Sequence, residues 1–324
     1  MDAQLIITYG DKTFIPAVKS GIKWNVKRRG SPGKLTFSIV EDGNFSIGEG
    51  AAVNFQYKNE KVFFGFVFSL NRKNDGLIEV TAYDQLRYLK NKDTRVYTAN
   101  TAGQLVRSIA DDYRLQTGVI EDTGFVIASR VEENTSLFDM IENALDLTLM
   151  NTKERFVLYD DFGKLSLKNI SSMYVGDGDN YLMIDEETGE SFDYKSSIDD
   201  DVYNKIKLTY DNEGTGKREV YIAQNSSHIN EWGVLQYFDT LKEGENGQAK
   251  ADALLKLYDK KYRSLKITKA FGDTRVRAGS LVLVKLRLGD VDVKNFMLAE
   301  EVSHNFEENQ YTMDLTLKGG VING

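Results

Sequence analysis

The chain has 324 residues, of which 41% are hydrophobic and 28% are charged, and its net charge is −8. This length allows two or more domains, and the composition excludes a largely disordered chain. The acidic balance excludes general nucleic-acid binding, which needs a basic surface, and the absence of cysteine excludes disulfides, thiolate catalysis and cysteine-bound metals.

The histidines and the apolar segments exclude further classes of site and location. The two histidines, His228 and His304, lie far apart, so there is no paired-histidine zinc motif. No segment approaches the ~20 apolar residues of a membrane span, and the first residues lack the basic start and apolar run of a secretion signal. We therefore expect no cofactor, no metal, no membrane span and no signal peptide. The protein is expected to be made and kept in a cytoplasm, or to leave it by a route without a signal peptide.

The first 98 residues have the pattern of antiparallel strands. Apolar residues alternate with polar ones in segments that short turns rich in Gly and Asn separate, which is typical of strands with one buried face. The segments with this pattern lie at residues 4–9, 21–27, 35–39, 53–57, 62–70 and 78–82. They predict a small antiparallel barrel or sandwich.

The next segment changes to helical spacing. Thr101, followed by Gln104 three residues later, has the capping-box pattern of a helix start, and the helix is expected to reach Arg114. Thr135 or Ser136 is expected to cap a second helix, whose apolar residues recur on one face. Residues 99–170 therefore predict a compact α+β module.

A hairpin and a connector are expected to follow. The Asp-Phe-Gly sequence at 161–163 is interpreted as the turn of a hairpin spanning 156–167, because no other kinase motif accompanies it. Residues 171–200 are polar and contain acidic runs such as 185–187, so we expect an acidic connector.

Residues 201–324 return to strand patterns. Strands are expected at residues 203–210, 219–223, 265–270, 281–286, 296–306 and 311–317. One helix is expected among them at 246–262, where apolar residues recur at helical spacing.

A weak internal repeat relates the two strand-rich parts. Gly50 and Gly279 each precede three apolar alternating segments of similar length and spacing. The segments are 53–57, 63–67 and 78–82 after the first glycine and 282–286, 296–299 and 311–315 after the second. Few residues are identical, so the sequence leaves open both a duplicated barrel and two unrelated meanders.

Catalytic motifs are few. The sequence has no nucleophile elbow, no P-loop and no dinucleotide-binding motif. Adjacent carboxylates occur at 111–112, 132–133 and 300–301, but neighbouring residues on a strand point to opposite faces, so such a pair does not form a glycosidase site. Carboxylates distant in sequence could do so, and a hydrolase therefore stays an alternative. Alternating aromatic residues leave a carbohydrate-binding module as a weaker one.

One loop concentrates positive charge. It contains Lys27, Arg28 and Arg29, with Lys34 after the turn. Such a cluster is either the solvated tip of a hairpin or a contact to an acidic partner surface, since charges at the rim of an interface steer docking.

Several local features occur in a fixed order along nearly the whole chain. They are Trp24 with Lys34-Leu35-Thr36-Phe37, Gly50 and Val53 before Phe63-Phe64-Gly65-Phe66-Val67, the segments 78–86 and 131–137, the helix segment 251–255, and Gly279-Ser280-Leu281-Val282. In this order they resemble phage tail baseplate hub proteins, in particular the PBSX-type prophage hub proteins (XkdQ/YqbQ-like) within the late control protein D class.

The resemblance implies a mainly β, α+β fold with two tail-tube-like antiparallel β-barrels and an intervening α+β module. It places the first barrel at 1–98, the module and acidic connector at 99–200, and the second barrel, with the inserted helix 246–262, at 201–324. It implies a homotrimer, in which two similar barrels per chain supply six equivalent positions between a sixfold tail tube and a threefold spike.

The same resemblance implies a structural role and no catalytic residue. The expected partners are the tail tube protein, the spike protein, other baseplate proteins and the tape-measure protein, with DNA only in transit through a polar lumen that the acidic balance of the chain would suit. The expected location is the bacterial cytoplasm during assembly, and then the baseplate of a contractile phage tail, a prophage-derived particle or a bacteriocin. The alternative is a tail-associated cell-wall hydrolase or esterase.

Overall fold

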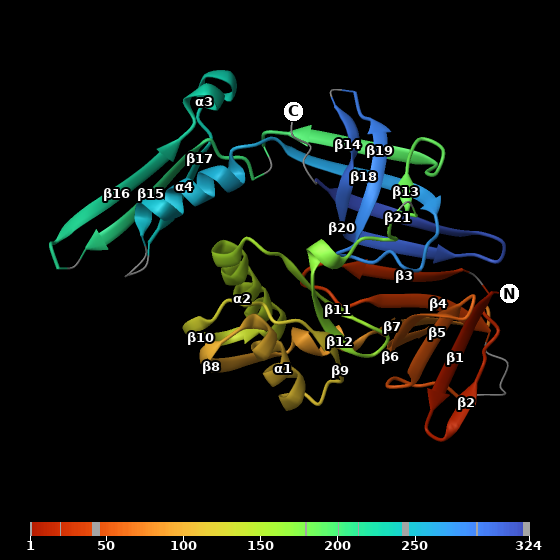
Figure 1. The fold of residues 1–324 in the computed structure, drawn as a ribbon. Helices are drawn as coiled ribbons and strands as arrows, with labels where there is room; N and C mark the ends of the chain where they lie inside the picture. The colour runs from red at the N-terminus through yellow and green to blue at the C-terminus, as the bar shows by residue number, and fades with distance from the viewer. Residues whose placement is uncertain are drawn as a thin grey trace. The chain divides into compact units, whose positions relative to one another are not determined.

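The computed structural model describes residues 2–19, 21–40, 46–178, 180–199, 201–212, 214–241, 246–289 and 291–319. Most of the regular structure is β-sheet, which confirms the predicted mainly β, α+β fold class (Figure 1). The chain divides into two compact units. One contains residues 1–193 and 265–324, and the other contains residues 194–264.

An antiparallel barrel forms the start of the first unit. Its strands are β1 (Ala3–Tyr9), β2 (Lys12–Phe14), β3 (Ile22–Lys27), β4 (Lys34–Val40), β5 (Ala52–Tyr57), β6 (Glu60–Arg72) and β7 (Leu77–Tyr83). They are neighbours in the order β3-β4-β7-β6-β5-β1-β2. A bridge between Val18 and Ile39 brings the chain after β2 back onto β4. The sheet therefore curls around one core, to which Ile7, Leu35 and Phe55 belong.

The alternating pattern of the sequence explains this barrel. Along β4 and β7 every second side chain is buried and the others are partly exposed, as the period of two requires for a sheet with one buried face. The β5–β6 hairpin turns through Lys58 and Asn59, both with positive φ, which is the two-residue turn that matches the twist of the strands.

The α+β module has its own core. It contains η1 (Gln85–Lys90), β8 (Lys92–Asn100), α1 (Ala102–Asp112), β9 (Thr117–Ile120), β10 (Ile127–Ser136), α2 (Leu137–Thr152), β11 (Phe156–Asp160), β12 (Leu165–Asn169) and η2 (Ile170–Ser172). The predicted capping box of Thr101 and Gln104 is present, and Ser136 caps the second helix. The turn at Asp161-Phe162-Gly163 is confirmed, because β11 and β12 pair antiparallel on either side of it.

The remaining strands continue the barrel sheet. They are β13 (Met183–Ile184), β14 (Ser191–Ser197), β18 (Tyr262–Phe271), β19 (Leu281–Arg287), β20 (Asp292–Phe306) and β21 (Tyr311–Lys318). Their order is β14-β18-β21-β20, with β19 beside β20 and β13 beside β19. The pairing of β20 with β3 joins them to the first barrel, so thirteen strands of the described chain form one sheet with two halves.

The two halves repeat the same strand order. The order β4-β7-β6-β5 of the first half corresponds to β18-β21-β20-β19 of the second. Both predicted glycines have positive φ, +83° at Gly50 and +96° at Gly279. The N–H of Gly50 donates to Val67 at 2.8 Å, and the N–H of Gly279 donates to Ala299 at 2.8 Å. The repeat seen in the sequence is therefore present in the backbone.

The strand registers also correspond residue by residue. The pairings of β6 with β7 and of β20 with β21 each contain one register shift, between Val67 and Ser69 in β6 and between Ala299 and Glu301 in β20. The pairs that match before and after it are Val53–Gly65 with Val282–Met297, Val67–Ala82 with Ala299–Leu317, Leu70–Val80 with Val302–Leu315, and Asn71–Glu79 with Ser303–Asp314. A shared bulge and register are specific, because bulges are built features of a fold. They exclude two unrelated meanders.

The second unit is a small sheet covered by a helix. It contains β15 (Lys205–Asn212), β16 (Lys217–Gln224), α3 (Ser226–Trp232), β17 (Gln236–Thr240) and α4 (Gly247–Tyr258). The strand order is β16-β15-β17, and α4 packs on β15 and β16 over a core that includes Ile206, Leu208 and Ala251.

Three predicted placements differ from the structure. The strands expected at 203–210 and 219–223 do not join the second barrel but form this separate sheet. Alternation of apolar and polar residues predicts that a segment is a strand, but it does not predict which strand lies beside it. The expected connector at 171–200 contains β13 and β14, which extend the barrel sheet. The helix expected at 246–262 ends at Tyr258. The domain division at 98 and 200 itself stays a prediction.

The repeat makes the two glycines a matched pair for mutation. At Gly50 an added Cβ meets nothing within 4 Å, whereas at Gly279 it would lie 2.8 Å from Val157. We expect Gly50→Ala to lower the free energy of unfolding by about 1–3 kcal/mol through backbone strain alone, and Gly279→Ala to cost more. Urea denaturation measures both, and an equal or smaller loss for Gly279→Ala would contradict the assigned packing.

Candidate partner-binding surface at the joint of the two sheet halves

One antiparallel pairing joins the two halves. Residues 22–27 of β3 lie beside residues 301–306 of β20, and Figure 1 shows the red strand next to the blue one. This is possible because β20 has 15 residues, so its first part pairs with β19 while its second part pairs with both β21 and β3.

The core side of the joint is built around His304. Its ring stacks on Trp24, with 4.8 Å between ring centroids, and Nε2 lies 3.0 Å from the carbonyl oxygen of Val276. The Tyr311 hydroxyl lies 2.8 Å from Nδ1. Because a carbonyl only accepts, Nε2 carries the proton and Nδ1 accepts from Tyr311. Burial lowers the pKa of His304 to about 4, so this imidazole is neutral at physiological pH.

The opposite side of the joint is polar. Lys27 Nζ lies 2.7 Å from Glu301, and the Ser303 hydroxyl donates to Asn25 Oδ1 at 2.6 Å. A groove of about 650 Å³ runs over this face. Its charged lining residues are Lys23, Lys27, Lys34, Lys90, Lys266, Glu301 and Asp314.

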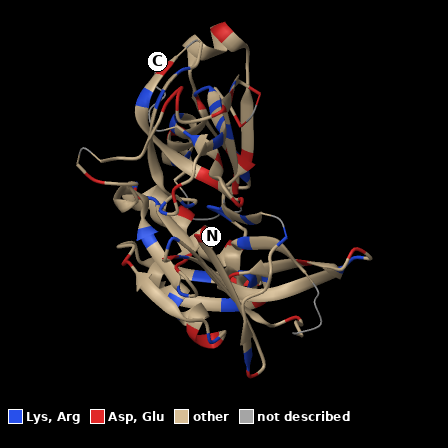
Figure 2. Cartoon of the chain, turned by 90° about the vertical axis from the view of Figure 1, so that its right-hand side faces the viewer, with Lys and Arg blue, Asp and Glu red and all other residues tan. Residues whose placement is uncertain are grey.

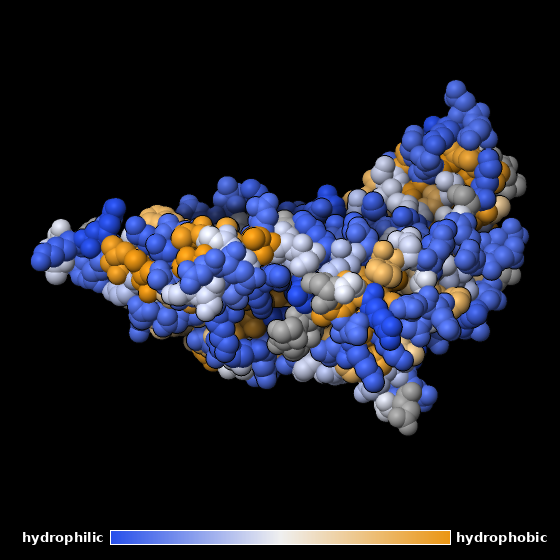
Figure 3. Space-filling model, turned by 90° about the horizontal axis from the view of Figure 1, so that it is seen from above, coloured by the Kyte–Doolittle hydropathy of each residue, from blue (hydrophilic) through white to orange (hydrophobic). Residues whose placement is uncertain are grey.

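This groove is locally basic, although the chain is acidic. Five lysines line it against two carboxylates. Along the ribbon as a whole, Lys and Arg are interspersed with Asp and Glu (Figure 2), and the face seen in Figure 3 is mainly hydrophilic with separate hydrophobic patches. The excess of acid in the composition is therefore not gathered on the polar face of the joint.

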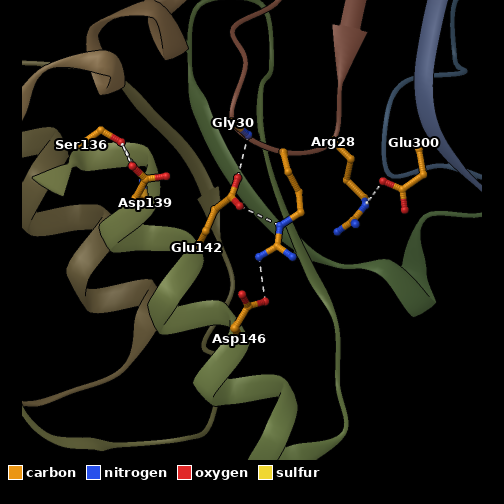
Figure 4. Close-up of polar contacts among 8 residues, drawn as sticks. Arg28, Gly30, Ser136, Asp139, Glu142, Asp146 and Glu300 are labelled. Atoms are coloured by element: carbon orange, nitrogen blue, oxygen red, sulfur yellow. Dashed lines mark hydrogen bonds and ion pairs between the residues drawn. The ribbon is translucent and has the colours of Figure 1, made fainter. Parts of the chain in front are cut away.

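The predicted basic loop separates into two parts. Lys27 and Lys34 line the groove. Arg28 Nε binds Glu300 at 2.9 Å, and Arg29 binds Glu142 and Asp146 on α2 at 2.8 and 2.7 Å (Figure 4).

The arginine side of the loop holds modules of the chain together. The backbone N–H of Gly30 donates to the same Glu142 carboxylate at 2.7 Å, so one helix side chain binds both loop backbone and arginine. These carboxylates are missed by sequence reasoning, since Glu142 and Asp146 are 113 and 117 residues away from Arg29. A role of Lys27, Arg28, Arg29 and Lys34 in partner contact stays a prediction. Of these four residues, the two arginines bind α2 or Glu300, whereas the two lysines line the groove.

A second polar cluster connects the barrel to the module. Asp84 is buried, and its carboxylate accepts from the N–H groups of Gly33 and Leu86 at 2.9 and 3.0 Å. Asp160 accepts from the Gly163 N–H at 2.6 Å. Burial raises the pKa of Asp160 to about 6 and raises that of Asp84 well above its ordinary value, to which the Asp160 charge also contributes.

These carboxyl groups have structural partners. Asp84 caps η1, and Asp160 fixes the β11–β12 turn. These structural roles explain why both carboxyl groups are buried, so their raised pKa values do not by themselves indicate a catalytic site. In the described part of the chain, no group of three or more His, Cys, Asp or Glu side chains is arranged to hold a metal ion. No helix within the described ranges is long and apolar enough to cross a membrane.

The lowered pKa of His304 predicts a pH dependence of stability. The unfolded chain binds the proton near pH 6.5 and the folded chain only near pH 4, so stability falls as the pH falls through this window. The loss from this group is about 3 kcal/mol. His304→Phe keeps an aromatic ring beside Trp24 and should flatten the dependence of the unfolding free energy between pH 6.5 and 4. Parallel curves for the two proteins would contradict this assignment.

The ion pairs at the loop should differ in strength. The side chains of Arg28 and Glu300 are each 17% exposed, whereas those of Lys27 and Glu301 are about half exposed, at 53% and 49%. Double-mutant cycles with alanine should give a coupling of about 1 kcal/mol or more for Arg28 with Glu300 and at most about 0.5 kcal/mol for Lys27 with Glu301. The reverse order would show that solvent screening does not govern these pairs.

Comparison with known proteins identifies relatives over almost the full length. The chain is 30% identical over 328 residues to the YqbQ protein of Bacillus subtilis (strain 168), covering 96% of each. It is 29% identical over 317 residues to the phage-like element PBSX protein XkdQ of the same organism, covering 94% of each.

A solved structure shares the fold. The 43 kDa tail protein of prophage MuSo2 from Shewanella oneidensis superposes with a TM-score of 0.70 at 13% identity, covering 97% of this chain and 98% of the other. The model of the YqbQ-like family matches residues 22–318, which include the first sheet half from β3 onward, the second half, the α+β module and the second unit. The chain therefore belongs to the YqbQ-like family.

Proposed function

We propose that the chain is a structural baseplate hub of a contractile phage tail or phage-tail-like particle, and that it assembles as a trimer between a sixfold tail tube and a threefold spike. Relatives named for the phage-like element PBSX and for a prophage tail support the tail assignment. The expected location is accordingly the baseplate of the particle.

The observation that carries the proposal is the repeat of the two sheet halves. They share strand order, glycine position, bulge and register while their residues differ. Three chains with two such halves present six similar surfaces on one side and three identical chains on the other. A ring of this kind meets both symmetries, and it has the closed point-group symmetry that most soluble homo-oligomers have.

The polar face of the joined sheet supports the same proposal. Around the joint, its lining includes Asn25, Thr36, Ser303 and Thr316 next to the charged residues. Such a face suits the wall of a water-filled passage. In this proposal, DNA in transit would meet charges of both signs near the joint, where five lysines and two carboxylates line the groove.

The expected partners are the tail tube protein, the spike protein, other baseplate proteins and the tape-measure protein. In this proposal the chain has a structural role and is not an enzyme. The two carboxyl groups with raised pKa are used for capping and turn formation, and nothing in their geometry favours the hydrolase alternative.

The native mass of the purified chain tests the proposal. One chain has a mass of 36.6 kDa, so we expect a species of about 110 kDa, alone or after addition of the spike protein, with a central opening in images. A chain that stays monomeric with both the spike and the tube protein, and that releases fragments from cell walls, would overturn the hub and favour the hydrolase.

A further inference from the structure

The two halves differ at one sheet edge. In the second half, residues 301–306 of β20 have a strand on each side, β21 and β3. The corresponding residues 69–72 of β6 pair with β7. The pairing of β6 with β5 ends at Phe66, and in the described chain no strand pairs with residues 69–71 on the side away from β7.

The exposure of this edge agrees with an open strand. Ser69 and Asn71 are exposed, whereas Ser303, the counterpart of Asn71, is half-buried where β3 covers it. An uncovered edge of this kind is a template for pairing with another strand, and natural proteins seldom leave one open.

The repeat also identifies a strand that fits the edge. In the first half, β3 lies beside β4 and then covers β20. In the second half, the strand beside β18, the counterpart of β4, is β14, which stands at the end of the sheet formed by the described strands. Both strands thus hold the same position, but among the strands that the structure describes only β3 pairs with a second one.

The side chains of β14 fit this assignment. Ser191, Phe192 and Asp193 are all exposed, and Phe192 retains 46% of its accessible surface. A large apolar side chain on an end strand is an aggregation liability unless a partner covers it. The counterpart strand β3 shows the covered state, because there Trp24 is buried against His304.

We propose that β14 of one copy pairs with residues 69–71 of β6 in the next copy, repeating between chains the joint that β3 and β20 make within a chain. The partner is a second copy of this chain, and the inference rests on the proposed trimer. The interface uses two different edges, so it is heterologous, and three copies close it into a ring. Backbone hydrogen bonds supply affinity, and burial of Phe192 supplies specificity.

Cysteine cross-linking tests this pairing, because the chain contains no cysteine of its own. Asn71 corresponds to Ser303, whose side chain meets that of Asn25 across the joint within a chain. We expect Asn71→Cys combined with Ser191→Cys or with Asp193→Cys to give covalent trimers under mild oxidation, because a directly opposed pair has the short Cβ separation that a disulfide needs.

The cross-linking experiment has a positive and a negative control. Asn25→Cys with Ser303→Cys should cross-link within one chain and leave the denatured mass at that of a monomer. Asn71→Cys alone should give no trimer band. A native trimer in which neither double variant cross-links would overturn this pairing while leaving the hub intact, whereas a monomer under all conditions, including with spike and tube proteins, would overturn both.

A second variant removes the apolar contact. Phe192→Lys should weaken self-association by at least about tenfold in sedimentation experiments, as loss of a buried aromatic anchor does. The matched control is Phe238→Lys, which replaces another exposed phenylalanine, 56% exposed, on β17. Equal effects of both substitutions, or none from Phe192→Lys, would count against β14 as the pairing strand.

Discussion

The pairing of β3 with β20 is the constraint on which the rest of the first unit depends. It links residues 22–27 to residues 301–306 and makes one sheet of two halves. Its core side buries Trp24 on a neutral His304, and its polar side forms the floor of the groove. The loop that leaves β3 carries the two arginines, so the same pairing also sets where the α+β module is held.

The two halves keep one side-chain hydrogen bond to an equivalent backbone carbonyl, although different residues donate it. His304 donates to the carbonyl oxygen of Val276, three residues before Gly279. In the first half the corresponding residue is Arg72, and its guanidinium lies 3.4 Å from the carbonyl oxygen of Ile47, three residues before Gly50. The backbone acceptor is the same in both, and two unlike side chains satisfy it, because a buried carbonyl left without a donor is costly.

Much of the fold could be read from the sequence, and the reasons are local. Alternation marks β4 and β7, and a capping box marks the start of α1, because each signal lies within a few neighbouring residues. Contacts between residues far apart in the sequence leave no local pattern of this kind. The sequence pattern therefore predicts the wrong sheet for the strands of residues 205–224, and it does not indicate the carboxylates that bind Arg28 and Arg29. The glycine spacing did indicate the repeat, but only the matching bulges of β6 and β20 exclude chance resemblance.

The separation of the joined strands also bears on how the chain is made. Asn25 and Ser303 bond across 278 residues, so during synthesis β3 emerges long before the strand that covers it. At ordinary elongation rates this interval is about 15 to 60 s. Throughout it, one edge of β3 and part of the Trp24 surface stay open on the ribosome-bound chain. The first barrel can close early through its own contacts, but the edge of β3 that pairs with β20 waits for almost the final strand, so during synthesis this edge is exposed to chaperones.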